Sequence, residues 1–205
     1  MNKQELLNSL AEKGFSKKII DAFSRVKRED FTPKNVRSMA YEDTALPIGK
    51  GQTISQPYTI AVMLSLMGLG KGQKVLEIGS GCGYVLALLS EIVGKNGKAY
   101  GIEVVKELAI KSKENLGGYR NITVYNRNGS EGLPEKAPFD SIIISAAIRD
   151  IPEKIMGQLK NNGIVVAPKG SRFEQEIVAI QRKSVSEFEI KKRIPGFVFV
   201  PFVRE

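Results

Sequence analysis

From residue 73 onward, the chain is a series of short apolar runs that alternate with segments of helical periodicity. The series reads QKVLEIG, YVLALLSEIVG, KAYGIE, VKELAIKSKENLGG, NITVYN, DSIIISAA, IPEKIMGQLKNNG and IVVAPKG. The runs that read as strands hold too few polar residues for one face to meet water, so they must be buried on both faces. Such strands form a parallel sheet with helices on each side. The sequence therefore predicts a doubly wound, mostly parallel α/β fold.

The residues before this series are expected to add a short helical extension. Helices are predicted at residues 3–13 and 16–28, where apolar side chains recur at helical spacing around a stop at Gly14. Residues 31–49 contain two prolines and are interpreted as a loop. The stretch GKGQTISQP, at 49–57, follows, and PYTIAVMLSLMGL is typical of a helix that begins at a permitted proline.

After residue 170 the pattern changes again. QEIVAIQRK, SEFEIKKRI and FVFVPFV follow one another with no helix between them, which predicts antiparallel strands at one edge of the sheet. No linker separates the three parts, 1–70, 71–170 and 171–205. We therefore expect residues 1–205 to form one domain.

The composition of the chain argues against several classes of function. The net charge is +9, but the basic residues are scattered and KKR at 191–193 is their only tight cluster, so a stable nucleic-acid partner is not expected. The chain has no histidine and one cysteine, Cys82, which argues against a metal site, a disulfide and a histidine-based catalytic pair. No signal peptide or membrane span is recognisable, so we expect a cytoplasmic protein without a membrane partner.

A glycine-rich turn, GSGCGY, follows the first strand of the series. Gly79, Gly81 and Gly83 give the spacing G-x-G-x-G, whereas a dinucleotide fingerprint needs G-x-G-x-x-G. Glu103 ends the second strand, at the separation from which a carboxylate accepts hydrogen bonds from ribose hydroxyls. Cys82 lies inside the turn without an activating partner, and we interpret it as a small filler.

Together, EIGSGCGY and YGIE resemble motif I and its acidic partner in the Rossmann-like methyltransferases that use S-adenosyl-L-methionine. The resemblance implies that this cofactor is held near the first two strands. The residues it assigns to cofactor binding there are Glu77, Gly79, Ser80, Gly81, Gly83 and Glu103.

Four further segments resemble one particular family among these methyltransferases. AYEDTALPIGKGQTISQPYTIAVML, LPEKAPFDSIIISAA, QLKNNGIVVAPKG and FVFVPF resemble the protein-L-isoaspartate O-methyltransferase family across nearly the whole chain. The resemblance implies methylation of the free α-carboxylate of L-isoaspartyl residues in damaged proteins, with D-aspartyl residues as an open question. Residues 1–70 would then hold the helices and a substrate lid, and 71–170 the cofactor-binding core. Ser55 would be the catalytic residue, with Thr53 and Ile54 beside the cofactor.

The chain departs from the family at three places, one of which is IRD at 148–150, where the family's loop often carries a proline. Where the family usually has GDG after the third strand, this chain has Arg127, Asn128 and Gly129, so an amide oxygen would accept from the adenine amino group. Where VTAA is common, Ser145 keeps the hydroxyl. The resemblance implies that the residues at these positions, Asn128, Gly129 and Ser145, complete the cofactor site.

The implied chemistry suits a chain without histidine. An α-carboxylate has an unperturbed pKa of about 3.5, so the nucleophile is already ionised at neutral pH and needs no general base. Ser55 would orient the carboxylate by donating a hydrogen bond, and its other interpretation is a helix N-cap. Because the substrates are diverse segments that need open access, we expect a monomer.

Two other functions remain open. A methyltransferase acting on RNA would fit the charge, but such enzymes place an aromatic residue after the fourth strand, where this chain reads ISAAIRD. A cofactor-binding module without catalysis would keep the glycine turn, but the intact lid argues against it.

Overall fold

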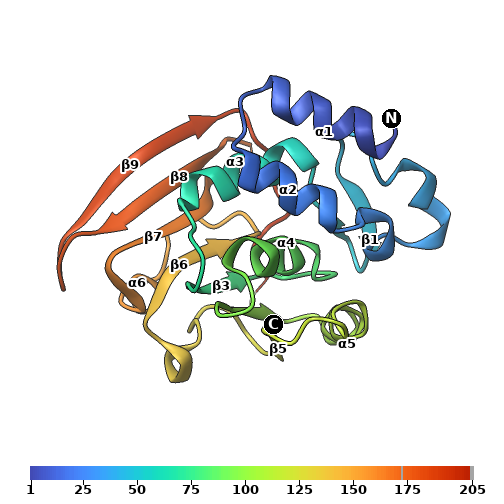
Figure 1. Ribbon diagram of the computed structural model, residues 1–205. Coiled ribbons are helices and arrows are strands. Elements are labelled where there is room, and N and C mark those ends of the chain that lie inside the picture. The colour runs from blue at the N-terminus through green and yellow to red at the C-terminus, as the bar shows by residue number, and fades with distance from the viewer. Residues whose placement is uncertain (172, 204–205) are drawn as a thin grey trace.

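The computed structural model describes residues 1–171 and 173–203, and within them a sheet of seven strands forms the centre of the molecule (Figure 1). The strand order is β5-β4-β3-β6-β7-β8-β9. The parallel strands are β3 (Lys74–Ile78), β4 (Lys98–Glu103), β5 (Ile122–Asn126), β6 (Phe139–Ile144) and β7 (Leu159–Gly170). The antiparallel strands are β8 (Gln175–Arg182) and β9 (Phe188–Pro195). The predicted α/β fold and its antiparallel edge are confirmed.

The strand order reverses beside β3. The chain runs outward from β3 to β4 and β5 and then returns to lay β6 on the other side of β3. The loops that leave the carboxyl ends of β3 and β6 therefore turn to opposite faces, which opens a crevice between them. The glycine turn follows β3 and Ser145 follows β6.

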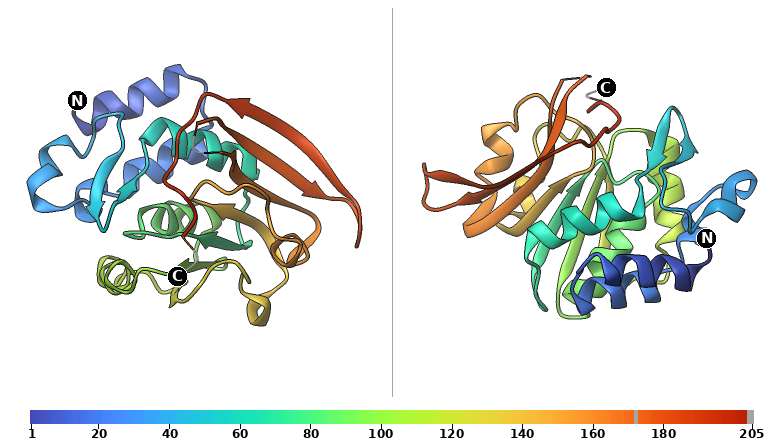
Figure 2. Two further views of the ribbon diagram at one scale, coloured as in Figure 1. Left: turned by 180° about the vertical axis from the view of Figure 1, so that it is seen from behind. Right: turned by 90° about the horizontal axis from the view of Figure 1, so that it is seen from above.

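One face of the sheet is covered by a complete helical layer. It consists of α3 (Pro57–Met67), α4 (Tyr84–Val93) and α5 (Lys106–Asn115), which pack against the strands. Over this layer lie α2 (Lys17–Arg25), against α4 and α3, and α1 (Lys3–Glu12), against α2 (Figure 2). Strand residues such as Val75 and Ile143 join the buried core beneath these helices.

The other face has a thinner cover. It carries α6 (Glu153–Met156) and the 3-10 helix η3 (Pro134–Lys136). Ile155 of α6 and Leu133, which precedes η3, belong to a second buried core. Helices thus lie on both faces, as predicted. The helical segment predicted for 151–163 is wrong beyond Met156, because Leu159 pairs with Phe139 and begins β7.

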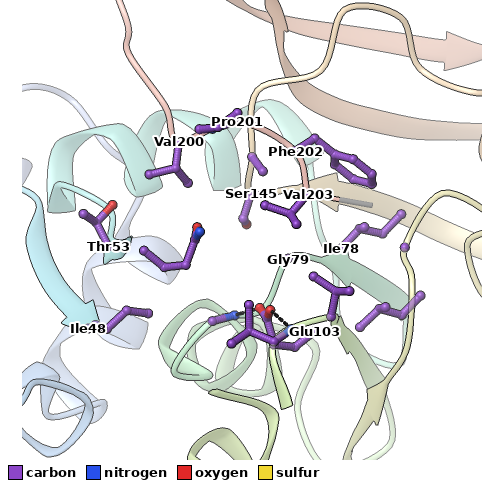
Figure 3. Close-up of a pocket in the computed structure, with 17 residues that line it drawn as sticks. Ile48, Thr53, Ile78, Gly79, Glu103, Ser145, Val200, Pro201, Phe202 and Val203 are labelled. Carbon is purple, nitrogen blue, oxygen red and sulfur yellow. Dashed lines mark hydrogen bonds between the residues drawn. The ribbon is translucent and has the colours of Figure 1, made fainter. Parts of the chain in front are cut away.

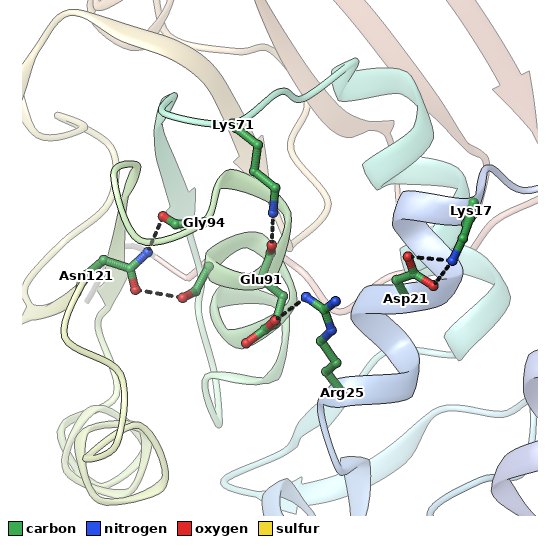
Figure 4. A network of polar contacts seen from close by, with 8 residues as sticks. Lys17, Asp21, Arg25, Lys71, Glu91, Gly94 and Asn121 are labelled. Carbon is green, nitrogen blue, oxygen red and sulfur yellow. Dashed lines mark hydrogen bonds and ion pairs between the residues drawn. The ribbon is translucent and has the colours of Figure 1, made fainter.

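The N-terminal helices are tied to the core by polar contacts. Arg25 of α2 forms an ion pair with Glu91 of α4 at 3.4 Å, and Lys71 donates to the carbonyl of Glu91 at 2.9 Å (Figure 4). The helix predicted for 3–13 is confirmed to within a residue as α1. The helix predicted for 16–28 is wrong after Arg25, because Val26 is extended, and Arg28 begins a 3-10 turn, η1 (Arg28–Phe31).

The stretch predicted as a loop before α3 contains a 3-10 helix, η2 (Lys34–Met39), and a β-hairpin. The hairpin, here called the lid hairpin, joins β1 (Leu46–Gly49) to antiparallel β2 (Gln52–Ile54). Lys50 and Gly51 form its turn with φ of 53° and 69°, and two successive positive φ values are those of a tight type I′ hairpin. The loop prediction is therefore wrong for residues 46–49, which form β1.

The predicted third antiparallel strand, FVFVPFV, is also wrong. Residues 196–203, here called the C-terminal segment, leave the sheet after β9 and cross its carboxyl end (Figure 2). Ala147 donates to the carbonyl of Val200 at 2.8 Å, and Phe202 donates to the carbonyl of Ala147 at 2.9 Å. These bonds hold the segment over the crevice beside β6. Across residues 1–171 and 173–203, no helix combines the length and apolarity that crossing a membrane requires.

Candidate active site

A cleft that is open to solvent lies at the carboxyl ends of β3, β4 and β6 (Figure 3). Its walls come from the lid hairpin, the ends of the parallel strands and the C-terminal segment. The lining includes Ile48, Gln52, Thr53, Ile78, Gly79, Gly81, Glu103, Val104, Gly129, Ser145, Val200, Pro201, Phe202 and Val203. This mixture of apolar walls with a few polar groups suits a small-molecule site.

The glycine turn forms the floor of this cleft. Gly79 and Gly81 have φ of 83° and 52°, a left-handed conformation that favours glycine. The amides of Gly79 and Ser80 donate to the carbonyl of Ile102 at 2.8 and 3.0 Å, which anchors the turn to β4. A Cβ on Gly81 would lie 3.1 Å from Cδ1 of Ile48, so the missing side chain lets the lid hairpin approach.

Two residues predicted for the cofactor site lie behind the turn. A Cβ on Gly83 would lie 2.7 Å from Oγ of Ser112, so this glycine allows α4 and α5 to pack closely. Ser80 is buried. Neither Gly83 nor Ser80 lines the cleft.

Glu103 is held in one orientation at the end of β4. Its side chain is 5% exposed, and its two carboxylate oxygens accept from the backbone amides of Gly81 at 2.7 Å and Val105 at 2.9 Å. Each oxygen has a second lone pair, so the carboxylate can also accept from a ligand in the cleft that it lines.

Glu77 has a different environment one strand away. It is 1% exposed, and its Oε1 accepts from the hydroxyl of Ser145 at 2.7 Å. Oε2 is buried and has no hydrogen-bond partner among the described residues. Burial raises the pKa of Glu77 to about 8. Glu77, although predicted for the cofactor site, does not belong to the lining of the cleft.

The loop after β5 supplies the next part of the wall. Gly129 lines the cleft, and a Cβ there would lie 2.4 Å from Cγ2 of Ile78 and 3.5 Å from Cζ of Phe202. Only glycine leaves room for this packing. Asn128 is outside the lining, and its Oδ1 accepts from the amide of Ser130 at 2.8 Å.

Ser55 lies in a second cleft, beside the first. This second cleft lies between the start of α3 and residues 194–200, and it shares Thr53 and Val200 with the first cleft. Thr53 thus faces both clefts, whereas Ile54 is 4% exposed and belongs to the hydrophobic core. The interpretation of Ser55 as a helix N-cap is wrong, because the N-cap of α3 is Gln56.

The sequence analysis missed the C-terminal part of the site. Val200, Pro201 and Phe202 line the first cleft, and Phe202 brings an aromatic ring that the local sequence after β6 lacks (Figure 3). Their alternating apolar pattern is also that of a strand, so only the path of the chain reveals their role. Within the described residues, no group of three or more acidic or cysteine side chains could hold a metal ion.

The arrangement can bind a nucleoside-like ligand. Glu103 offers acceptors for hydroxyls, and the apolar walls offer a surface for a planar base. S-adenosyl-L-methionine has both of these parts, so the residues present fit it.

Comparisons with known proteins agree with this geometry. The family model described as protein-L-isoaspartate(D-aspartate) O-methyltransferase matches residues 1–205. A protein-L-isoaspartate O-methyltransferase of Ignicoccus hospitalis is 42% identical and covers 99% of this chain and 98% of its own. The one from Fervidobacterium nodosum is 42% identical, covering 96% and 98%.

Solved structures have the same fold. A protein-L-isoaspartate O-methyltransferase superposes with a TM-score of 0.90 at 30% identity, and the match spans 98% of this chain but 65% of that longer chain. A Plasmodium falciparum protein of the same description, in complex with S-adenosyl-L-homocysteine, superposes with a TM-score of 0.86 at 24% identity over 100% of both chains. The full-length match to the family model and the 42% identity of the relatives mean that this chain belongs to the protein-L-isoaspartate(D-aspartate) O-methyltransferase family.

Proposed function

We infer that the protein transfers the methyl group of S-adenosyl-L-methionine to the free α-carboxylate of L-isoaspartyl residues in damaged proteins and peptides, which begins their repair through a succinimide. The observation that carries this inference is the pair of clefts that meet at Thr53 and Val200. The first has the acceptors for the cofactor, and the second has Ser55 for a carboxylate. Family membership supports the same reaction.

The cofactor roles follow from the surroundings of each residue. Glu103 would accept from the ribose hydroxyls. Gly129 and Phe202 would border the adenine, with Asn128 near its edge. Ser145 would keep Glu77 oriented through their 2.7 Å hydrogen bond.

The chemical step requires alignment more than proton transfer. When bound, S-adenosyl-L-methionine supplies a methyl group on a sulfonium, which is a good leaving group. The α-carboxylate is ionised at neutral pH, so no residue need remove a proton. Ser55 would donate a hydrogen bond that orients the carboxylate at the junction of the clefts. The lid hairpin and the C-terminal segment would exclude water from that junction.

The whole chain would act as one catalytic domain. Residues 1–70 would supply the lid hairpin, 71–170 the cofactor-binding core, and 171–205 the strands and segment that close the clefts. We expect a cytoplasmic monomer, because diverse substrates need open access to the second cleft. Acceptance of D-aspartyl residues is part of the family's description, and we propose testing it directly.

Radiolabelled methyl transfer tests the function. We expect label in a peptide with an L-isoaspartyl residue and none in its L-aspartyl twin or in bulk RNA, with a D-aspartyl peptide assayed alongside. Base-labile label is expected, since a methyl ester forms. Label in RNA alone would favour the RNA methyltransferase, which the family model does not support. Cofactor binding without transfer to any of these substrates would favour a binding module.

A further inference from the structure

Arg28 is a completely buried arginine that holds four backbone carbonyls. Its side chain is 0% exposed at the start of η1. Nη1 donates to the carbonyls of Ala40 at 2.7 Å and Glu42 at 3.2 Å. Nη2 donates to the carbonyls of Thr44 and Ser55, each at 3.0 Å. One guanidinium therefore connects residues 40–44 to the end of the lid hairpin.

The charge of Arg28 has little direct compensation. Among the described residues no carboxylate lies within ion-pair distance of it, and the carboxylate of Asp43, which lies near, accepts instead from the amide of Tyr58 at 2.8 Å. The ring of Tyr84 lies 5.9 Å from the guanidinium carbon, and Nε is buried without a partner. A guanidinium stays protonated in proteins, so the residue is a buried positive charge.

A buried charge often contributes less to the stability of a core than an apolar side chain of similar size. Burying an ion costs several kcal/mol, and well-packed apolar residues are often at least as stabilising as a buried charge network. The four carbonyls offset part of the cost, since hydrogen bonds to charged groups are stronger than neutral ones. Packing alone therefore does not account for an arginine here.

The position of the charge suggests its use. Thr44 and Ser55 both line the second cleft, and the same Nη2 donates to the carbonyls of both. The guanidinium thus lies directly behind two residues of the wall that would receive the substrate. A positive charge there would attract a carboxylate in the cleft and leave a neutral group unaffected.

We propose that Arg28 is a positioning residue that fixes Ser55 and makes the second cleft selective for a carboxylate. The proposal rests on the proposed function, because it takes the second cleft as the isoaspartyl site. For a guanidinium and a carboxylate about 8 Å apart, at an effective dielectric constant of about 20 to 40, Coulomb attraction favours the carboxylate over a neutral amide roughly 5- to 30-fold.

The test separates charge from geometry. Arg28→Gln removes the charge but keeps two N–H donors, and Arg28→Lys keeps the charge but loses the planar fork. The matched control is Arg182→Lys, since Arg182 also donates to three backbone carbonyls, those of Gly157, Leu159 and Ser184, at 2.6 to 2.9 Å, outside both clefts. Denaturation curves establish that each variant is folded at the assay temperature.

Calorimetry with saturating S-adenosyl-L-homocysteine would compare an isoaspartyl peptide with its α-carboxamide analogue, and kcat/KM would be measured for the peptide. We expect Arg28→Gln to lose the 5- to 30-fold preference for the carboxylate. Arg28→Lys should keep that preference and lose roughly tenfold in kcat/KM, whereas Arg182→Lys should change neither.

The outcomes are distinct. If folded Arg28→Gln keeps the preference of the wild type, the charge has no role and the proposal is overturned. If Arg28→Gln does not fold, Arg28→Lys decides, and a kcat/KM equal to that of Arg182→Lys overturns the positioning role. If the wild type itself neither prefers the carboxylate nor methylates the peptide, the proposed function fails, and this inference fails with it.

Discussion

Glu77 and Glu103 are both buried acids on neighbouring strands, but the structure gives them different surroundings. Both oxygens of Glu103 are oriented by backbone amides, which prepares them to accept from fixed hydroxyls. One oxygen of Glu77 is oriented by Ser145 and the other is unpaired. Replacing Glu103 therefore tests hydrogen bonding to the cofactor. Replacing Glu77 tests how a buried acid affects the stability of the protein.

Glu103→Ala should weaken the binding of S-adenosyl-L-methionine by about 1.5–3 kcal/mol, the usual contribution of a hydrogen bond to a charged group. Glu114→Ala is the control, because Glu114 is exposed and pairs with Lys111 on the surface of α5, away from the cleft. Calorimetry measures both affinities. Equal affinities for the wild type and Glu103→Ala would remove Glu103 from the site.

Glu77 should make the free protein less stable as the pH rises. Its folded-state pKa is about 8, above the reference value of 4.5, so between these pH values the folded state binds more protons than the unfolded state. The free energy of unfolding should therefore fall by up to about 1.4 kcal/mol per pH unit in that window. Glu77→Gln, which does not ionise, should lack this slope. Urea denaturation from pH 5 to 9 measures the difference, and parallel curves would contradict it.

Ser55→Ala should lower kcat/KM for an isoaspartyl peptide roughly tenfold to a thousandfold, a loss of about 1.4–4 kcal/mol in transition-state stabilisation. The affinity for the cofactor should be nearly unchanged, because Ser55 lines only the second of the two clefts. Ser65→Ala, at an exposed position of α3, is the control. Full activity of Ser55→Ala would mean that the lid hairpin acts through its backbone alone.

At the scale of elements, one side chain of β8 helps the backbone of Ala147 to hold the C-terminal segment in place. Oε1 of Gln175 accepts from the amide of Phe199 at 2.7 Å, and Nε2 donates to the carbonyl of the same residue at 3.4 Å. The side-chain amide of Gln175 thus makes the two backbone hydrogen bonds to Phe199 that a neighbouring strand would otherwise make. Because Val200 faces both clefts, a change in this segment should affect both ligands.

Gln175→Leu should raise KM for the cofactor and for the peptide together, each about threefold to tenfold, since it leaves a buried amide unpaired and loosens the segment. Gln181→Leu is the matched control, because Gln181 is on the same strand and its amide donates to Asn162 away from both clefts. Steady-state kinetics with each substrate varied measures the effect. An increase in only one KM would show that the segment does not couple the two sites.

At the scale of the whole molecule, the basic cluster KKR lies on β9, the outer strand of the sheet. Arg193 pairs with Glu176 and Lys191 with Glu189, so the cluster is partly neutralised. Charged side chains on an edge strand discourage pairing with another chain. This arrangement supports a monomer better than it supports a nucleic-acid site.

Replacing residues 191–193 by threonine should therefore leave methyl transfer to a peptide unchanged and promote concentration-dependent self-association. Sedimentation velocity of the wild type and of the triple variant measures this. A wild-type dimer would contradict the expected monomer, and a loss of methyl transfer in the variant would give the cluster a role in the reaction.

The sequence by itself determined the parallel core and the place of its glycine turn. Buried strands, amphipathic helices and left-handed glycines are local patterns, so Gly79, Gly81 and Glu103 could be located at strand ends without coordinates. The resemblance to a family also singled out Ser55 before its cleft was known.

Tertiary structure decided the rest, because it depends on contacts between residues far apart in the chain. Pairing with Phe139 made Leu159 the start of a strand. Hydrogen bonds to Ala147 and Gln175 hold residues 197–203, which were predicted as a strand, across the crevice, where Phe202 lines the cofactor cleft. Arg28 was the last residue of the helix predicted at 16–28, yet its guanidinium is buried against carbonyls as many as 27 residues away. Local periodicity carries no information on such partners, and only the folded chain brings them together.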